Sequence, residues 1–195
     1  MISNATPVAT IMHRTVPVSL VFARHYLPVV RKVHVDEDHS ARGAYVLHNA
    51  AAGARQVTLL ATAPEALLAV QARAMLEDQG IGCTVVSKPC RELFDRQAAV
   101  YRAATLGSGT RIAVEAACRM GWDAYLGTCG GFIGMSGFGA SGPADALYEK
   151  FGITVLRSWR RQSVCSHIRA ASWRAAIDCW RQGAPYGSSH TVSRA

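Results

Sequence analysis

The sequence predicts an α/β domain of three layers, in which helices cover both faces of a mostly parallel β-sheet. Short apolar segments alternate along the chain with longer amphipathic segments. Hydrophobic residues make up 50% of the 195 residues and charged residues 17%, a composition typical of a folded domain rather than a disordered chain. Alternation of this kind favours parallel strands that are joined by right-handed crossovers.

The predicted strands are short and rich in β-branched residues. Buried strands are expected at Val57–Ala61, Cys83–Ser87 and Arg111–Glu115. A glycine-rich stretch over residues 127–142 contains a further short segment, Phe132–Met135, that could form a strand. Together these segments supply the sheet of the predicted domain.

The predicted helices lie between and after these strands. Thr62 and Glu65 have the spacing of a capping box, so a helix should begin there and run to about Asp78, where Gly80 follows to end it. One face of this helix is apolar and carries Leu68, Ala72, Met75 and Leu76. A second amphipathic helix is predicted over residues 92–104, and Pro143 should open a third that runs through Phe151.

The N-terminal part has one predicted strand and one candidate ligand residue. Residues 16–22 form an apolar segment that we expect to be a buried strand, and Arg24 follows its end. Open α/β sheets bind ligands at the carboxyl ends of their strands, and a guanidinium group suits phosphate, but from the residues alone a surface ion pair is favoured for Arg24. Residues 33–43 are polar and without pattern, which indicates a linker, and residues 45–47 could form an edge strand.

The charge and the cysteines exclude several classes of protein. The net charge is +8, but seven arginines and a single acid, Asp178, follow residue 152, so the body is nearly neutral and nucleic-acid binding is not favoured. Six cysteines form no C-x-x-C pair, which argues against structural zinc and for free thiols. No segment is long and apolar enough for a membrane span, and no signal-peptide pattern opens the chain, so we expect a cytoplasmic protein.

Several segments suggest chemistry without establishing it. The glycines of residues 130–142 could bind phosphate, but they lack the known phosphate-loop patterns and better suit turns and close packing. Acidic residues 36–38, between His34 and His39, could bind a metal, although a solvated linker is the more ordinary interpretation. Cys90 could be a nucleophile, but packing is favoured. Glu115 ends a buried strand and should accept hydrogen bonds there. The residues alone therefore predict no catalytic group and no metal site.

Motifs in the body of the chain resemble those of transketolases. Residues 86–97 (VSKPCRELFDRQ) resemble the family segment VSMPCWELFDxQ, and residues 111–116 with Gly121 and Trp122 resemble RVAVEA followed by GW. Residues 137–144 and 147–152 resemble FGASAP and LYEKFG, while Leu59–Thr62 with Glu65 is similar to LxATGSE. These segments occur in the family's order over about residues 44–154, so the resemblance implies the fold of the transketolase C-terminal domain.

Upstream, residues 17–28 look like the end of the transketolase middle domain, PxxLxxSRQNLP. The arginine of that motif binds the substrate's phosphate group in the family, and Arg24 occupies its position. The chain departs from the family where Ala23, His25 and Tyr26 replace Ser, Gln and Asn, and where Arg91 replaces Trp. Family likeness ends after about residue 154, where a basic segment begins.

The resemblance implies a division of the chain and a function. We expect residues 1–32 to be a remnant of the middle domain, 33–48 a linker, 49–154 the C-terminal domain and 155–195 a disordered, non-homologous tail. Full-length transketolases transfer two-carbon ketol units between sugar phosphates with thiamine diphosphate and Mg²⁺, which bind in domains that this sequence does not contain. The chain alone should therefore be inactive and hold no cofactor. Alternatives are a subunit of a split transketolase, paired with a chain that carries the cofactor domains, or a small binding or regulatory module. A homodimer is also possible.

Overall fold

A computed structural model describes residues 37–153, except 63 and 129, together with scattered positions between 15 and 30. Arg24 and the segment 155–195 lie outside the described residues. Within the described part, a five-stranded sheet has the order β1-β3-β2-β4-β5. The strands are β1 (Tyr45–His48), β2 (Val57–Ala61), β3 (Cys83–Ser87), β4 (Thr110–Val114) and β5 (Gly131–Ile133). All neighbouring pairs are parallel except β1 with β3, so the predicted mostly parallel sheet is confirmed.

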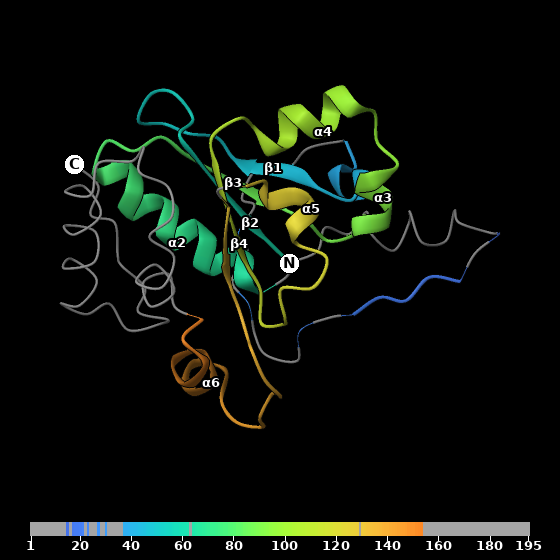
Figure 1. The fold of residues 1–195 in the computed structure, drawn as a ribbon, viewed down its shortest axis with the longest axis vertical. Helices are drawn as coiled ribbons and strands as arrows, with labels where there is room; N and C mark the ends of the chain where they lie inside the picture. Colours follow the sequence, from blue (N-terminus) through green and yellow to red (C-terminus); the bar gives the residue numbers. More distant parts are fainter. Residues whose placement is uncertain are drawn as a thin grey trace.

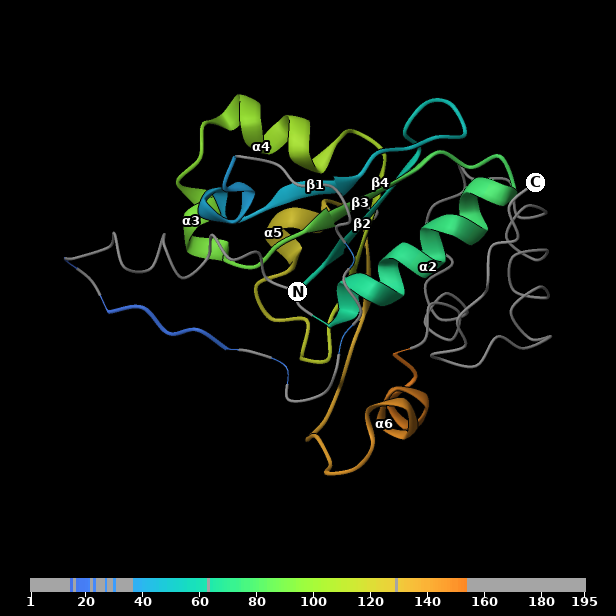
Figure 2. The ribbon, with the colours of Figure 1, turned by 180° about the vertical axis from the view of Figure 1, so that it is seen from behind.

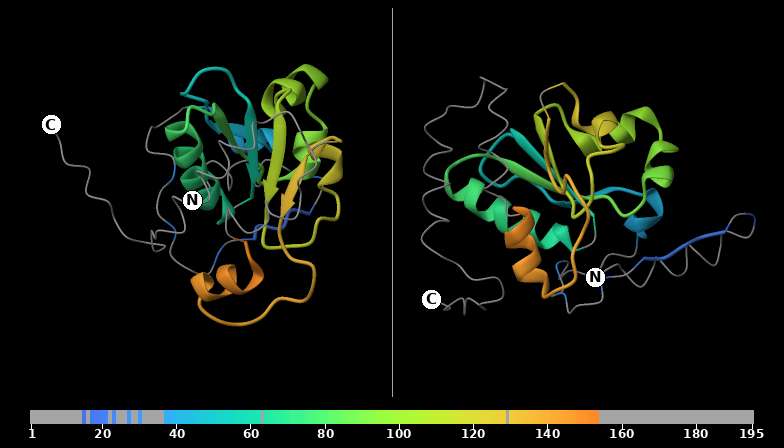
Figure 3. Two further views of the ribbon diagram at one scale, coloured as in Figure 1. Left: turned by 60° about the vertical axis from the view of Figure 1, so that its left-hand side comes forward. Right: turned by 60° about the horizontal axis from the view of Figure 1, so that its bottom comes forward.

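Helices cover both faces of this sheet, which gives the three predicted layers (Figures 1 and 2). One face carries α2 (Glu65–Asp78), and the other carries α3 (Arg91–Asp95), α4 (Ala99–Leu106) and α5 (Asp123–Leu126). The remaining helix, α6 (Ala144–Phe151), packs Tyr148 and Phe151 against the hydrophobic cluster on the α2 side. The left view of Figure 3 shows α6 beyond one end of the sheet, below α2. No helix of the described part is both long and apolar enough to cross a bilayer.

Alternate residues of the strands belong to two separate hydrophobic clusters, one on each face of the sheet. Leu59, Val85 and Val114 point to the α2 side, whereas Leu60 and Val86 point to the side of α3, α4 and α5. The side chains of successive strand residues project to opposite faces, so a strand buried on both faces must be apolar throughout. This explains why β2 is buried at every position and why it occupies the centre of the sheet.

The second predicted helix is interrupted in the structure. Instead of one helix over residues 92–104, α3 ends at Asp95 and α4 begins at Ala99. Ala98 between them has an extended backbone (φ −55°, ψ 144°), which breaks the helical path. The break lets Phe94 enter the core at 0% exposure while α4 runs in a new direction above it.

The predicted capping box at the start of α2 is also wrong. Pro64 occupies the N-cap position, and no side chain caps this end of the helix. The backbone carbonyl of Thr62 accepts the Glu65 amide at 3.1 Å, while the Glu65 side chain turns into the interior. A buried partner, described below, therefore takes the place of the capping interaction.

The N-terminal side of the domain differs from the expectation as well. Within the expected linker 33–48, residues His39–Arg42 form a 3-10 helix, η1, and β1 pairs with β3, so these residues belong to the folded unit. Asp38 caps η1 by accepting the amide of Ser40 at 3.0 Å. Residues 17–21 form no strand, and Val21 is 83% exposed. The prediction of a buried strand is wrong for these described positions, because no strand of the sheet pairs with them.

Candidate functional site

The carboxyl ends of the parallel strands meet at one edge of the sheet, and polar residues follow three of them. We call this the carboxyl edge; it follows Ala61, Ser87, Val114 and Ile133. Glu65 comes after β2, Lys88 directly after β3, and Glu115 directly after β4. Ligands of open α/β sheets bind at such an edge, so these three side chains are the first candidates for a functional site.

Lys88 is the least expected member of this edge. It is 1% exposed, and its Nζ has no hydrogen-bond partner among the described residues. The ammonium group lies 3.8 Å from the centre of the Tyr125 ring and 5.0 Å from that of Trp122. Burial, together with the nearby charge of Arg91, lowers the pKa of Lys88 to about 8. An amine with this pKa is a possible base or nucleophile, but here the surrounding rings separate it from solvent.

Glu115 is held by the same aromatic group. The indole nitrogen of Trp122 donates a hydrogen bond to its Oε2 at 2.6 Å, and the Glu115 amide bonds to the Ile133 carbonyl at 2.9 Å. The expectation that Glu115 accepts a hydrogen bond above the sheet is confirmed. Its role is to fix the loop between β4 and α5 against β5.

Glu65 joins two helices. It is 4% exposed, and the Tyr148 hydroxyl of α6 donates to its Oε1 at 2.9 Å. Burial raises the pKa of the Glu65 carboxyl group, although hydrogen bonds from its own amide and from Tyr148 oppose this shift. The contact ties α6 to the start of α2 and is a structural link.

The remaining sequence candidates have ordinary structural roles where they are described. The Cys90 thiol donates to Glu92 at 3.4 Å, and burial raises the pKa of Cys90, which favours the unreactive thiol. Cys83, Cys90 and Cys118 are free thiols, as expected. A side chain at Gly130 would collide with Leu126 and one at Gly134 with Ala117, so these glycines allow close packing. No cluster of three metal-ligating side chains occurs within the described residues.

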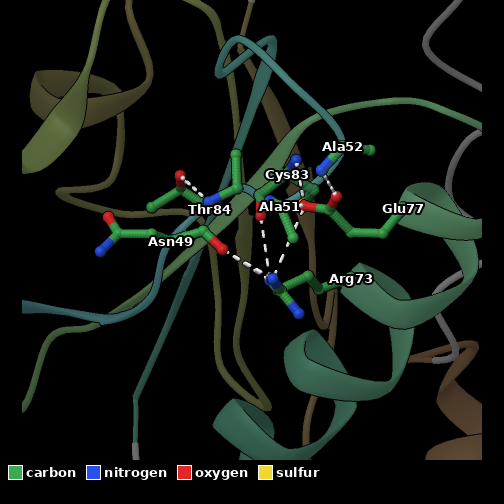
Figure 4. Close-up of polar contacts among 8 residues, drawn as sticks. Asn49, Ala51, Ala52, Arg73, Glu77, Cys83 and Thr84 are labelled. Atoms are coloured by element: carbon green, nitrogen blue, oxygen red, sulfur yellow. Dashed lines mark hydrogen bonds and ion pairs between the residues drawn. The ribbon is translucent and has the colours of Figure 1, made fainter.

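The opposite, amino edge of the sheet carries a polar clamp that the sequence did not reveal (Figure 4). The Glu77 carboxylate accepts the amides of Ala51 at 3.0 Å, of Cys83 at 2.9 Å, and of Ala52. Arg73, one turn earlier on α2, donates to the carbonyls of Asn49 and Cys83. Charge-assisted bonds to backbone groups are strong, so this clamp fixes the loop between β1 and β2 to α2.

At the carboxyl and amino edges of the sheet, the polar side chains described above are either hydrogen-bonded within the domain or enclosed by it. They stabilise the fold and do not form an open reaction site. Arg24, the one predicted ligand residue, lies outside the described residues. Sequence reasoning missed Lys88, Arg73 and Glu77, and no local pattern in the sequence marks these three side chains. The described geometry therefore assigns no reaction, and comparison with known proteins decides the family.

The family model of the transketolase-like C-terminal domain matches residues 43–154. The chain belongs to the transketolase family. It is 48% identical to a transketolase of Sinorhizobium medicae over 183 residues, which cover 92% of this chain and 25% of that protein. The chain therefore spans about a quarter or less of the length of the curated relatives that it matches.

Solved structures agree with this assignment. A transketolase from Leishmania mexicana superposes with a TM-score of 0.55 at 40% identity, covering 63% of this chain and 18% of that one. A split-gene transketolase described as an inactive β4 tetramer shares the fold, with a TM-score of 0.51 at 22% identity over 78% of this chain and 47% of its own. The matched region begins at residue 43, close to η1, so the transketolase C-terminal domain includes β1.

Proposed function

We propose that this chain supplies the C-terminal domain of a transketolase, and that it takes part in ketol transfer only together with domains that bind thiamine diphosphate. The observation that carries this proposal is the match of residues 43–154, which spans nearly all of the described fold. Its edge groups are engaged in internal contacts, as Glu115 is with Trp122. The described residues contain no cluster of three metal-ligating side chains that could hold a divalent ion.

In this proposal the segment 1–32 is the end of the middle domain, and Arg24 binds the phosphate group of a sugar-phosphate substrate once the complete enzyme is assembled. The position of Arg24 in the motif of residues 17–28 supports this role. A guanidinium group makes two parallel hydrogen bonds to phosphate, which lysine cannot reproduce. The protein would act in the cytoplasm, as a homodimer or with a second transketolase subunit.

A calorimetric titration of the purified chain with thiamine diphosphate and Mg²⁺, combined with a ketol-transfer assay, tests this proposal. We expect no binding heat and no turnover from the chain alone, because no side chain replaces the thiazolium group as an electron sink. Saturable binding with turnover would overturn the proposal, since the chain would then hold a complete active site.

A second candidate is a subunit of a split transketolase. It is favoured by the structural neighbour that is itself a split-gene transketolase and is described as inactive in its tetrameric form. The chain should then form a stable complex with cofactor-binding domains supplied in trans. Size-exclusion chromatography with the Sinorhizobium medicae relative, shortened by its C-terminal quarter, checks this; co-elution with restored turnover supports the subunit, and separate elution argues against it.

A further inference from the structure

Two loops at the carboxyl edge expose large apolar side chains. Phe138, in the loop after β5, is 99% exposed, and Met120, in the loop after β4, is 80% exposed. The amide of Met135 donates to the carbonyl of Ala117 at 2.9 Å, which joins the two loops near the sheet. Figures 1 and 2 show the loop after β5, in orange, extending away from the sheet before α6 begins. We call these loops the edge loops; they cover residues 115–122 and 134–143.

The edge loops carry little free charge for an exposed surface. Residues 136–143 are all exposed and contain no ionisable side chain. In the loop after β4, Glu115 accepts the indole N–H of Trp122, and Arg119 pairs with Asp123 at 2.6 Å. Burying a phenylalanine or methionine side chain is favourable by about 1.5–3 kcal/mol. Exposed apolar groups on an uncharged surface are typical of contacts between proteins, and do not suit a charged ligand.

The polypeptide also enters the domain at the carboxyl edge. Because β1 is antiparallel to β3, Tyr45 at the start of β1 lies opposite Ser87 at the end of β3. Gly43, just before β1, accepts the amide of Cys90, just after β3, at 3.0 Å. The strands β1 and β5 are the outer strands of the sheet, so the chain entry and the loop after β5 are about 19 Å apart, which is four strand spacings.

A domain that precedes this one in a longer chain therefore lies within reach of the edge loops. The matched family model is that of a C-terminal domain, and the match covers 25% of the Sinorhizobium medicae relative, so most of that relative comes before it. A domain of about 150 residues has a radius of gyration of about 15 Å. Such a domain is wider than the span from the chain entry to the loop after β5, and seated on the carboxyl edge it would cover both edge loops.

We propose that the edge loops are the surface on which the preceding domain of a complete transketolase docks, with Phe138 inserted into an apolar hollow of that domain. This inference rests on the proposed function, because it takes the partner to be a transketolase domain. It adds to that function the contact surface and the residue that anchors it. The competing occupant is a second copy of this chain, which the experiment distinguishes.

Hydroxyl-radical footprinting tests the proposal by measuring how fast exposed side chains are oxidised. It would compare this chain alone with a chimera, in which its residues 43–153 replace the corresponding segment of the Sinorhizobium medicae transketolase. The oxidation rates of Phe138 and Met120 should fall at least about fivefold in the chimera, because docking removes both side chains from water. Met75, a partly exposed residue in the last turn of α2 at the amino edge, should keep its rate.

Two results would overturn the proposal. One is an equal oxidation rate of Phe138 in the isolated chain and in the folded chimera. The other is protection of Phe138 in the isolated chain that grows with protein concentration, because a second copy would then occupy the surface.

The variant Phe138→Ser locates the anchor. Phe138 is almost fully in solvent, so the melting temperature of the isolated chain should change by no more than about 1 °C. In the chimera, the variant should raise the oxidation rate of Met120 at least about threefold, since the loss of the anchor loosens the contact. Val100→Ser is the matched control, because Val100 is 82% exposed on α4, outside the edge loops, and it should leave Met120 protected. An unchanged Met120 rate in the Phe138→Ser chimera would overturn the role of Phe138.

Ketol transfer by the same chimera separates this proposal from the proposed function. Protection of Phe138 and Met120 without turnover would support the docking surface and argue against the proposed function. Turnover without protection would support the proposed function and overturn the docking surface.

Discussion

The ammonium group of Lys88 lies 3.8 Å from the centre of the Tyr125 ring, inside the domain. A cation over an aromatic face gains about 0.5–2 kcal/mol, and Trp122 offers a second ring at 5.0 Å. Burial opposes the charge more strongly, so the net effect is a pKa lowered to about 8. Protonated Lys88 therefore lowers the stability of the native state.

Lys88→Met should stabilise the domain at pH 7, by an amount on the order of 1–3 kcal/mol. The folded-state pKa of Lys88 is about 8, against 10.5 for an ordinary lysine, so between these values the unfolded chain binds more protons. Stability of the native protein should therefore rise with pH across this window. The advantage of the variant should be constant below about pH 8 and shrink from there to about pH 10.5.

Urea unfolding of both proteins from pH 6 to 10.5 measures this difference. Lys150→Met, which removes an exposed ammonium group from α6, is the matched control for the loss of one lysine. A stability difference between native protein and Lys88→Met that stays flat over the whole range would contradict the burial of a charged Lys88.

Glu77→Gln should destabilise the domain by about 1–2 kcal/mol at pH 7. Burial disfavours the Glu77 carboxylate, but three backbone amides and Arg73 outweigh burial and lower the pKa of Glu77. A carboxyl group with a lowered pKa contributes stability above about pH 4.5, and this contribution is lost as the pH falls through the folded-state value. Chemical unfolding at pH 7 and pH 3 should show a smaller stability difference between the two proteins in acid. Asp78→Asn, on the exposed neighbour, serves as the control.

Glu65→Gln, on the same helix as Glu77, should not destabilise the domain at pH 7, in contrast to Glu77→Gln. Burial raises the pKa of Glu65, so its charged form destabilises the native state at pH 7 and the domain gains stability as the carboxyl group is protonated. Glutamine keeps an oxygen that accepts the Tyr148 hydroxyl but carries no charge. The free energy of unfolding of the variant should therefore equal that of the native protein or exceed it by up to about 1 kcal/mol. A clear loss of stability at pH 7 would show that the Glu65 carboxylate is needed by its neighbours.

Gly43→Ala should destabilise the domain by at least about 2 kcal/mol. Gly43 has a φ of +77°, and a Cβ there would collide with the backbone of Phe94 and Cys90. Gly53→Ala is the matched control, because Gly53 has a similar φ of +89° and open space around it. Gly53→Ala should lose less stability, about 1 kcal/mol, because only the backbone conformation is unfavourable there. Equal losses in thermal unfolding would mean that the contact between Gly43 and α3 is absent.

The strands were predictable because apolar, β-branched runs have few alternatives. Val57–Ala61 and Cys83–Ser87 match β2 and β3 at both ends, and β4 differs from its prediction by one residue. The break between α3 and α4 was not predictable, because it occurs at Ala98, a good helix former. Tertiary packing of Phe94 overrides that local preference.

The polar groups of the interior were harder to predict than the apolar ones. A lysine at the end of a strand is ordinarily exposed, so nothing local indicates that Lys88 turns inward beneath two aromatic rings. Glu65 had the spacing of a helix cap, but its partner Tyr148 comes 83 residues later. Such contacts depend on the packing of distant elements, which single-sequence patterns do not record. Family resemblance succeeded because it rests on motifs spread over the whole domain.

Domain exchange tests the central claim most directly. Residues 43–153 of this chain would replace the corresponding segment of the Sinorhizobium medicae transketolase, to which the chain is 48% identical. Ketol transfer by the chimera, by the unmodified enzyme and by the enzyme without this segment would be measured with thiamine diphosphate and Mg²⁺ present. We predict turnover within about tenfold of the unmodified enzyme. A folded, cofactor-binding chimera no more active than the shortened enzyme would contradict the assignment of this chain as a working transketolase C-terminal domain.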